Sequence, residues 1–165
     1  MIIIVRGVSG CGKTTIGQIL ARDLGYFFID ADNYHPVKNR CKLQRGIALD
    51  DADREPWLMA VKEIVKKHQK QDRSAVLACS ALKQVYRKLL GCDQAEVKSI
   101  LLNGPFNIIK QRLHERDHEF MNSGLLQSQF DTLEFCPQER QFDIRIPPET
   151  IVKKIILDLK LQSLT

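Results

Sequence analysis

Residues Gly7-Val8-Ser9-Gly10-Cys11-Gly12-Lys13-Thr14 fit the pattern G-x-x-x-x-G-K-[ST] at every fixed position. The β-branched apolar run at 1–5, just before them, predicts a buried strand. After them, apolar residues at 16, 19, 20 and 24 recur at helical spacing, and Gly25 supplies a helix stop. A strand, a glycine-rich loop and a helix in this order form the arrangement that a phosphate-binding loop requires.

The chemistry of this loop predicts which residues bind a nucleotide. Glycines allow backbone conformations that side chains forbid, so successive N–H groups can point at phosphate oxygens, and the positive end of the following helix faces the same anion. Lys13 is expected to reach the β- and γ-phosphates of ATP, and the Thr14 hydroxyl is expected to bind Mg²⁺. The predicted nucleotide-binding residues of the loop are Gly7, Val8, Ser9, Gly10, Cys11, Gly12, Lys13, Thr14 and Thr15.

Composition narrows the class of protein. The 165 residues, 44% hydrophobic and 27% charged, predict a single domain over 1–165. No apolar run reaches the roughly 20 residues of a membrane helix, and no basic segment precedes the first apolar run, so neither a membrane span nor a signal peptide is expected.

The net charge of +5 is dispersed and no nucleic-acid-binding signature occurs, which favours small anions as partners. The 5 cysteines lack C-x-x-C spacing, which favours the reducing cytoplasm over a disulfide frame or a zinc site.

The rest of the chain alternates between strand and helix patterns. Further strands are predicted at 26–30, 74–79, 97–102 and 142–146. Helices are predicted at 53–71, 81–90, 125–133 and 149–161, with one more ending at 116. Asp53 is expected to cap the first of these helices, with Pro56 in its first turn. The pattern predicts an α/β domain of three layers around a five-stranded parallel sheet.

Acidic residues follow the second predicted strand. Ligands of parallel sheets bind beyond the carboxyl ends of the strands, so Asp30 and Asp32 are expected beside the phosphate-binding loop. One is a candidate partner for Mg²⁺, and the other is a candidate base that accepts the proton of an acceptor hydroxyl. The residues alone do not assign the two roles, and a solvated turn that caps a helix is the alternative.

Several cations are candidates for binding anionic groups. Lys83 and Arg87 are spaced i, i+4 after the third predicted strand, so they are expected to share one helix face at the same edge of the sheet. Arg112 and Arg116 have the same spacing and lead into the polar segment 117–124, which is predicted to be a lid that excludes water. The other candidates are His35 and Arg54. His35 lies in the polar segment 33–53, which is predicted to form a short helical excursion that binds the substrate.

Cys11 suggests a separate hypothesis. A thiol at a helix N-terminus beside Lys13 is expected to have a lowered pKa and to be reactive. Its modification would then block nucleotide binding.

Five blocks resemble one known family, the gluconokinases of the shikimate-kinase-like group of P-loop small-molecule kinases. The phosphate-binding loop alone is common to many families, whereas the other four blocks in this order are far more specific. Those blocks are Asp30-Ala31-Asp32-Asn33-Tyr34-His35-Pro36 with Asn39 and Lys42, Leu49-Asp50-Asp51-Ala52-Asp53-Arg54-Glu55-Pro56-Trp57-Leu58, Cys79-Ser80-Ala81-Leu82-Lys83-Gln84-Val85-Tyr86-Arg87, and Gln129-Phe130-Asp131-Thr132-Leu133-Glu134.

The resemblance implies a P-loop fold like that of nucleoside monophosphate kinases, and ATP-dependent phosphorylation of D-gluconate at its 6-hydroxyl. It implies Lys13, Asp32 and Arg112 as catalytic residues, with Asp32 as the base, and Thr14 with Asp30 on the metal side. Arg112 and Arg116 would cover the nucleotide, Pro137 would border the adenine, and the protein would be a homodimer. The implied sugar-acid pocket consists of Asp32, His35, Arg54, Lys83, Arg87 and Gln129.

The chain departs from the family at three places. Cys11 replaces a common serine, Leu43 replaces a common methionine, and the lid reads Arg116-Asp117-His118-Glu119-Phe120 where Arg-x-Gly-His-Phe is usual. The altered lid keeps a catalytically weak nucleotide-binding protein open as an alternative. Another small-molecule kinase, similar to shikimate or adenylate kinase, is a second alternative. A nucleotide-dependent switch is disfavoured because Asp-x-x-Gly and Asn-Lys-x-Asp segments are lacking.

Overall fold

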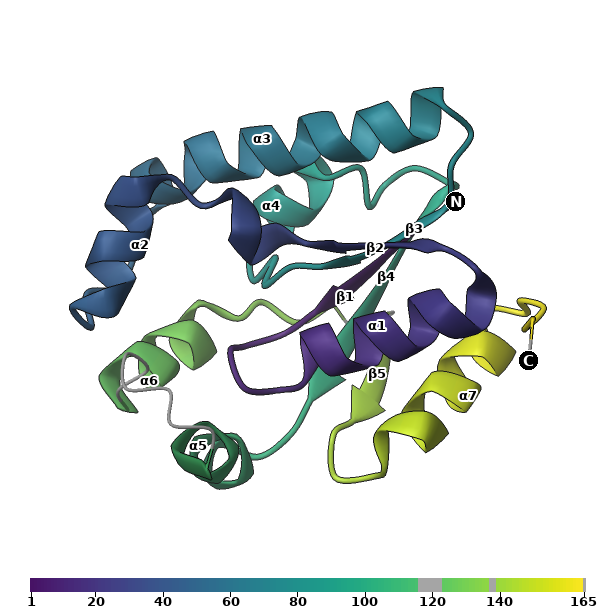
Figure 1. The fold of residues 1–165 in the computed structure, drawn as a ribbon. Coiled ribbons are helices and arrows are strands. Elements are labelled where there is room, and N and C mark those ends of the chain that lie inside the picture. Colours follow the sequence, from purple (N-terminus) through teal and green to yellow (C-terminus); the bar gives the residue numbers. More distant parts are fainter. Residues whose placement is uncertain (116–122, 137–138, 165) are drawn as a thin grey trace.

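The computed structural model describes residues 1–115, 123–136 and 139–164. Within them, five parallel strands form one sheet in the order β2-β3-β1-β4-β5 (Figure 1). The bounds of the strands are β1 Ile2–Arg6, β2 Phe27–Asp30, β3 Ala75–Ala78, β4 Val97–Asn103 and β5 Arg140–Asp143. The central strand β1 is buried along its whole length, as expected for a continuous apolar run covered on both faces. The predicted five-stranded parallel sheet is therefore confirmed.

Helices cover both faces of this sheet and make the three layers (Figure 1). Ile2 and Ile4 point to one face, where they pack in a core with α3 and α4. Ile3 and Val5 point to the other face, where they pack in a second core with α1, α5 and α7. The bounds of the helices are α1 Lys13–Leu24, η1 Ala31–Tyr34, α2 Val37–Gln44, α3 Asp51–Lys70, α4 Gln84–Leu89, α5 Phe106–Glu115, α6 Ser123–Thr132 and α7 Pro148–Asp158.

Some of the helices lie at the end of the sheet where the strands finish. Figure 1 shows α2, α5 and α6 beyond the carboxyl ends of the strands, around the loop that joins β1 to α1. The polar excursion at 33–53 forms the end of η1, α2 and the first turn of α3. Residues 117–122 of the predicted lid lie outside the described residues, whereas 123 and 124 belong to α6. No helix in the described parts of the chain is long and apolar enough to cross a membrane.

The N-cap of helix α3 lies three residues before the predicted cap. The Asp50 side chain accepts a hydrogen bond from the Asp53 backbone N–H at 2.8 Å, and the Asp53 carboxylate accepts one from the Asp50 N–H at 3.2 Å. This reciprocal pair is a capping box, so Asp50 is the N-cap and Asp53 is the third helical residue. The prediction that Asp53 caps this helix was therefore wrong.

Other predicted elements also differ in their bounds, among them α4 and β5. Helix α4 begins at Gln84 instead of 81, because Ala81 has a left-handed backbone with φ of 39° and Lys83 is extended. Strand β5 ends at Asp143 instead of 146, where the Asp143 side chain accepts a hydrogen bond from the Arg145 N–H at 2.8 Å and forms a turn. Residues 144–146 therefore leave the sheet and lie near α5 and α7.

Candidate active site

The loop between β1 and α1 has the backbone that its glycines permit. Gly10 and Gly12 have φ of 80° and 101°, which other residues rarely adopt. At Gly10 there is also no room for a side chain, since a Cβ would lie 2.7 Å from Leu113 of α5. Lys13 is the first residue of α1, and its ammonium donates to the Val8 carbonyl at 3.0 Å, across the loop. Packing against α5 therefore holds the loop in a shape whose N–H groups can surround a phosphate.

Thr14 and Asp30 meet beside this loop. The Thr14 hydroxyl donates to Asp30 Oδ2 at 3.0 Å, and Asp30 Oδ1 accepts from the Asp32 N–H at 3.0 Å. A hydroxyl and a carboxylate are the hard oxygen donors that Mg²⁺ prefers, and Mg²⁺ in kinases commonly uses only one or two protein ligands. Across the described residues, no group of three or more His, Cys, Asp and Glu side chains could hold a metal ion. The two residues fit a site that phosphates and water would complete.

A cavity of about 300 Å³ opens between the loop, α2, α3 and α6. The structure brings into it four of the six predicted sugar-acid residues, Asp32, His35, Arg54 and Gln129, together with Lys13. Its other lining residues are Ser9, Arg40, Leu43, Gln44, Ala48, Leu49, Trp57, Ser80, Leu82, Leu125 and Ser128. Arg40, Gln44, Ser80 and Ser128 are polar lining residues that were not predicted, since an isolated polar residue in a sequence carries no signal of which cavity it lines.

His35 lies flat against Trp57 in the wall of this cavity. The ring centroids are 4.1 Å apart with an angle of 17° between the planes, and the Trp57 indole N–H donates to the Ala31 carbonyl at 2.7 Å. His35 Nε2 lies 3.8 Å from Asp32 Oδ1. Burial lowers the pKa of His35, although the Asp32 carboxylate opposes this effect. His35 is therefore a neutral imidazole near pH 7.

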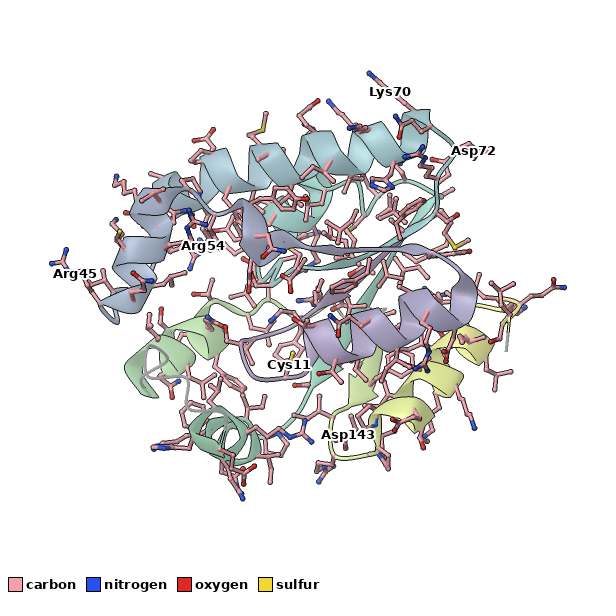
Figure 2. All side chains as sticks on the ribbon, viewed as in Figure 1. Cys11, Arg45, Arg54, Lys70, Asp72 and Asp143 are labelled. Atoms are coloured by element: carbon pink, nitrogen blue, oxygen red, sulfur yellow. The ribbon has the colours of Figure 1, made fainter. Side chains whose placement is uncertain are left out.

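Arg54 enters the cavity from the first turns of α3, whereas Arg45 at the end of α2 points away from the molecule (Figure 2). Arg54 Nη1 lies 3.4 Å from the Tyr86 hydroxyl and 3.5 Å from Asp51 Oδ1. The guanidinium carbon is 5.9 Å from the centroid of the Tyr86 ring. These contacts hold a cation at the cavity wall, where it can meet an anionic group.

Lys83 and Arg87 are not among the residues that line the cavity. The Lys83 ammonium binds the two Asp51 carboxylate oxygens at 2.8 and 2.7 Å, which lowers the pKa of Asp51. Arg87 is buried, and its Nη1 donates to the carbonyls of Leu82 at 3.0 Å and Glu134 at 3.2 Å. The expected shared face does not form, because Lys83 precedes the helix in an extended conformation.

Gln129 connects α6 to the phosphate-binding loop. Its side-chain oxygen accepts from the Ser9 backbone N–H at 2.7 Å, and its amide nitrogen donates to the Ser9 hydroxyl at 3.0 Å. Gln129 thus touches the loop as well as the cavity predicted for the sugar acid.

A second cavity, of about 270 Å³, lies beside the N-terminus of α1. Arg112 borders it and donates to the Ile144 carbonyl at 2.7 Å, so the residues released after β5 hold this cation. Its lining residues are Cys11, Gly12, Thr15, Ile16, Arg112, Glu115, Ile144, Ile146, Pro148 and Ile151. Arg116 and Pro137, also predicted near the nucleotide, lie outside the described residues.

Cys11 does not have the environment that its position in the sequence suggested. The residue is 1% exposed, in the loop before α1 (Figure 2). Burial raises the pKa of its thiol and outweighs the neighbouring Lys13 charge, so the expected lowering was wrong.

We therefore expect iodoacetamide to leave Cys11 of the folded protein unmodified while it alkylates Cys41, which is exposed. Mass spectrometry of digested samples, with and without denaturant during the labelling, measures both sites. Rapid labelling of Cys11 in the native sample would contradict its burial, and Cys41 serves as the internal control.

Comparisons with known proteins show which family the chain belongs to. A family model described as shikimate kinase matches residues 9–146. A gluconokinase of Arabidopsis thaliana is 41% identical, with 94% of this chain and 90% of that protein aligned. The structure of a sugar kinase from Janibacter sp. HTCC2649 is similar with a TM-score of 0.88 at 39% identity, covering 97% of this chain and 94% of the other.

A gluconokinase from Sinorhizobium meliloti 1021 has a similar structure, with a TM-score of 0.85 at 37% identity, covering 96% of this chain and 90% of the other. Identity at this level over nearly whole chains goes beyond a shared fold. The chain therefore belongs to the gluconokinases of the shikimate kinase family and is a small-molecule kinase.

Proposed function

We propose that this sugar-acid kinase transfers the γ-phosphoryl group of ATP to the 6-hydroxyl of D-gluconate, giving 6-phospho-D-gluconate and ADP. The observation that carries the proposal is one shared cavity. Lys13 of the phosphate-binding loop lines the same 300 Å³ cavity as Asp32, His35 and Arg54. A phosphate at the loop and a polyhydroxy acid in the cavity would thus be adjacent.

The loop and the second cavity support the nucleotide part of the proposal. Phosphates at the loop would meet its N–H groups and the Lys13 ammonium, and the adenosine would extend into the cavity bordered by Thr15 and Arg112. Charge that spreads over the transferring group is stabilised by fixed cations, which is the role we assign to Lys13 and Arg112.

The contacts of the two acids support different roles for them. Asp30 is bound to the Thr14 hydroxyl, so we assign Thr14 and Asp30 to Mg²⁺, which when bound would neutralise phosphate charge. Asp32 lines the cavity, and its side chain is 67% exposed, so we assign it as the base for the acceptor hydroxyl.

Arg54 and Gln129 support recognition of a sugar acid. Arg54 is a half-buried cation able to bind a carboxylate, and the Gln129 amide offers a donor and an acceptor for hydroxyl groups. A site built to hydrogen-bond several hydroxyls is expected to discriminate strongly against analogues that lack them.

A coupled assay for ADP release tests the proposed function. The purified protein, with ATP and Mg²⁺, is given D-gluconate, D-glucose, shikimate or adenosine monophosphate in parallel. We expect turnover with D-gluconate alone, and we expect the phosphorylated carbon to be C6 by ³¹P–¹³C coupling in the product. Preference for shikimate or the monophosphate would assign the protein to one of the other kinase classes, and no turnover with any acceptor would favour a nucleotide-binding protein.

Arg54 and Lys83 allow a paired test of the sugar-acid pocket. We expect Arg54→Met to raise the KM for gluconate by about 10–100-fold, from the ~1.5–3 kcal/mol of a charged hydrogen bond, with the KM for ATP unchanged. We expect Lys83→Met to have a much smaller effect, because Lys83 binds Asp51 outside the cavity wall. Steady-state kinetics with both substrates measures these KM values. Equal increases in the KM for gluconate in the two variants would show that Lys83 also belongs to the pocket.

A further inference from the structure

A buried amide of α2 contacts the histidine of the cavity. Asn39 is 2% exposed, and its Nδ2 donates to the Asp53 backbone carbonyl at 2.7 Å. A carbonyl oxygen can only accept, so this bond sets which end of the Asn39 amide carries the hydrogens. The NH₂ group therefore faces the start of α3, with one hydrogen directed to Asp53 and a second one available.

The same Nδ2 atom lies 3.5 Å from His35 Nδ1. Because the amide nitrogen has hydrogens and no lone pair to offer, this contact is favourable only when His35 Nδ1 is the acceptor. A neutral imidazole that accepts at Nδ1 carries its proton at Nε2. The contact thus selects one of the two tautomers of His35.

The ring is also held in orientation. Stacking on Trp57 at 4.1 Å fixes the plane of the imidazole, and the bond from Trp57 to the Ala31 carbonyl fixes Trp57. In this orientation Nε2 is the ring nitrogen that faces Asp32, at 3.8 Å from Oδ1. A small movement of the exposed Asp32 side chain would close that gap to a hydrogen bond.

The charges around His35 are mixed. Asp32 favours its protonation, whereas Arg54, Arg40 and burial oppose it. On the far side of Asn39, the Asp53 carboxylate is bound by Lys42 and lies 3.7 Å from Lys38, so it is already neutralised. The contact with Asn39 adds a preference for which ring nitrogen of His35 carries the proton.

We propose that Asn39 is a positioning residue that holds His35 as the Nε2–H tautomer, so that His35 donates a hydrogen bond to Asp32 and orients its carboxylate toward the acceptor hydroxyl. The tautomer is inferred from the contacts and the burial of His35, whereas its effect on catalysis rests on the proposed function. A donor at one oxygen of the carboxylate would fix its orientation and leave the other oxygen to accept the proton.

Nitrogen NMR of the protein labelled with ¹⁵N-histidine tests the tautomer without any substrate. At pH 7 we expect the His35 signals to show an unprotonated Nδ1 and a protonated Nε2, assigned by comparison with His35→Gln. A protonated Nδ1 in the wild-type protein, as the other tautomer or as imidazolium, would overturn the inference. This measurement needs no Asn39 variant, so it stands even where such a variant folds poorly.

Asn39→Asp then tests the positioning role. Its carboxylate can only accept near neutral pH, so we expect a proton on His35 Nδ1 and a kcat about tenfold lower, by analogy with residues that orient metal-bound imidazoles. Asn107→Asp, an exposed position on α5 with the same charge change, is the matched control.

The outcomes separate the two proposals. A shifted tautomer with unchanged kcat in Asn39→Asp would overturn the positioning role. If the wild-type enzyme fails to phosphorylate D-gluconate, the proposed function fails, and the NMR measurement still decides the tautomer.

Discussion

Replacing Lys13 with methionine is expected to lower kcat for phosphoryl transfer by about 10²–10³-fold, by analogy with the loss of one preorganised donor at a developing oxyanion. Lys13 is the cation of the phosphate-binding loop, and it also lines the cavity proposed for the sugar acid. Its ammonium makes one hydrogen bond to the Val8 carbonyl, so its loss removes little from the folded state. Steady-state kinetics measures the effect, and thermal unfolding checks that the variant is folded.

Arg22→Met is the matched control for this variant. Arg22 is an exposed cation in the last turn of the same helix, so the control makes the same kind of change at the opposite end of α1. It is expected to leave kcat unchanged. A Lys13→Met enzyme with wild-type kcat would show that the loop does not hold the transferred phosphate.

Asp32→Asn is expected to lower kcat by about 10²–10⁴-fold, the usual contribution of a positioned general base. The amide retains the shape of the carboxylate but cannot accept the proton of the acceptor hydroxyl. Because the Asp32 side chain is 67% exposed, we expect the unfolding temperature to change little. Binding of ATP, measured by calorimetry, is expected to persist because Asp32 is not in the phosphate-binding loop.

Two other substitutions make the Asp32 result specific. Asp72→Asn is the neutral control, since Asp72 lies beyond the far end of α3 (Figure 2) in a left-handed conformation that asparagine tolerates. Asp30→Asn is expected to raise the Mg²⁺ concentration needed for half-maximal rate, because Asp30 is bound to Thr14. If Asp30→Asn abolishes turnover while Asp32→Asn retains it, the two roles are exchanged.

Local patterns predicted most of the fold. The strand and helix predictions depend on the period of the backbone, which is the same in any context. They rest on the apolar run before Gly7, the helical periodicity after Thr14 and the later apolar segments. Both faces of β1 pack in hydrophobic cores, in agreement with that run. Errors were confined to the ends of elements, as at Asp50, where hydrogen bonds between nearby residues set the boundary.

The site was predicted less completely, and the reasons are physical. Spacing along a helix places two residues on one face only if both belong to the helix, and Lys83 does not. The reactivity expected of Cys11 considered its charged neighbour but not its burial, which depends on residues distant in sequence. The Asn39–His35 contact and the stacking of His35 on Trp57 likewise join side chains through the packing of α2 against α3.

The order of residues by itself determined the phosphate-binding loop, which depends on neighbours along the chain. It also predicted the parallel sheet from the alternation of strand and helix patterns, and the kinase family from five blocks of sequence. Only the tertiary structure decided that Arg54 lines the cavity while Lys83 and Arg87 do not, and that His35 lies between Trp57, Asn39 and Asp32. The physical reason is that burial and hydrogen-bond partners are properties of the packed chain. They arise only when segments far apart in sequence exclude water together.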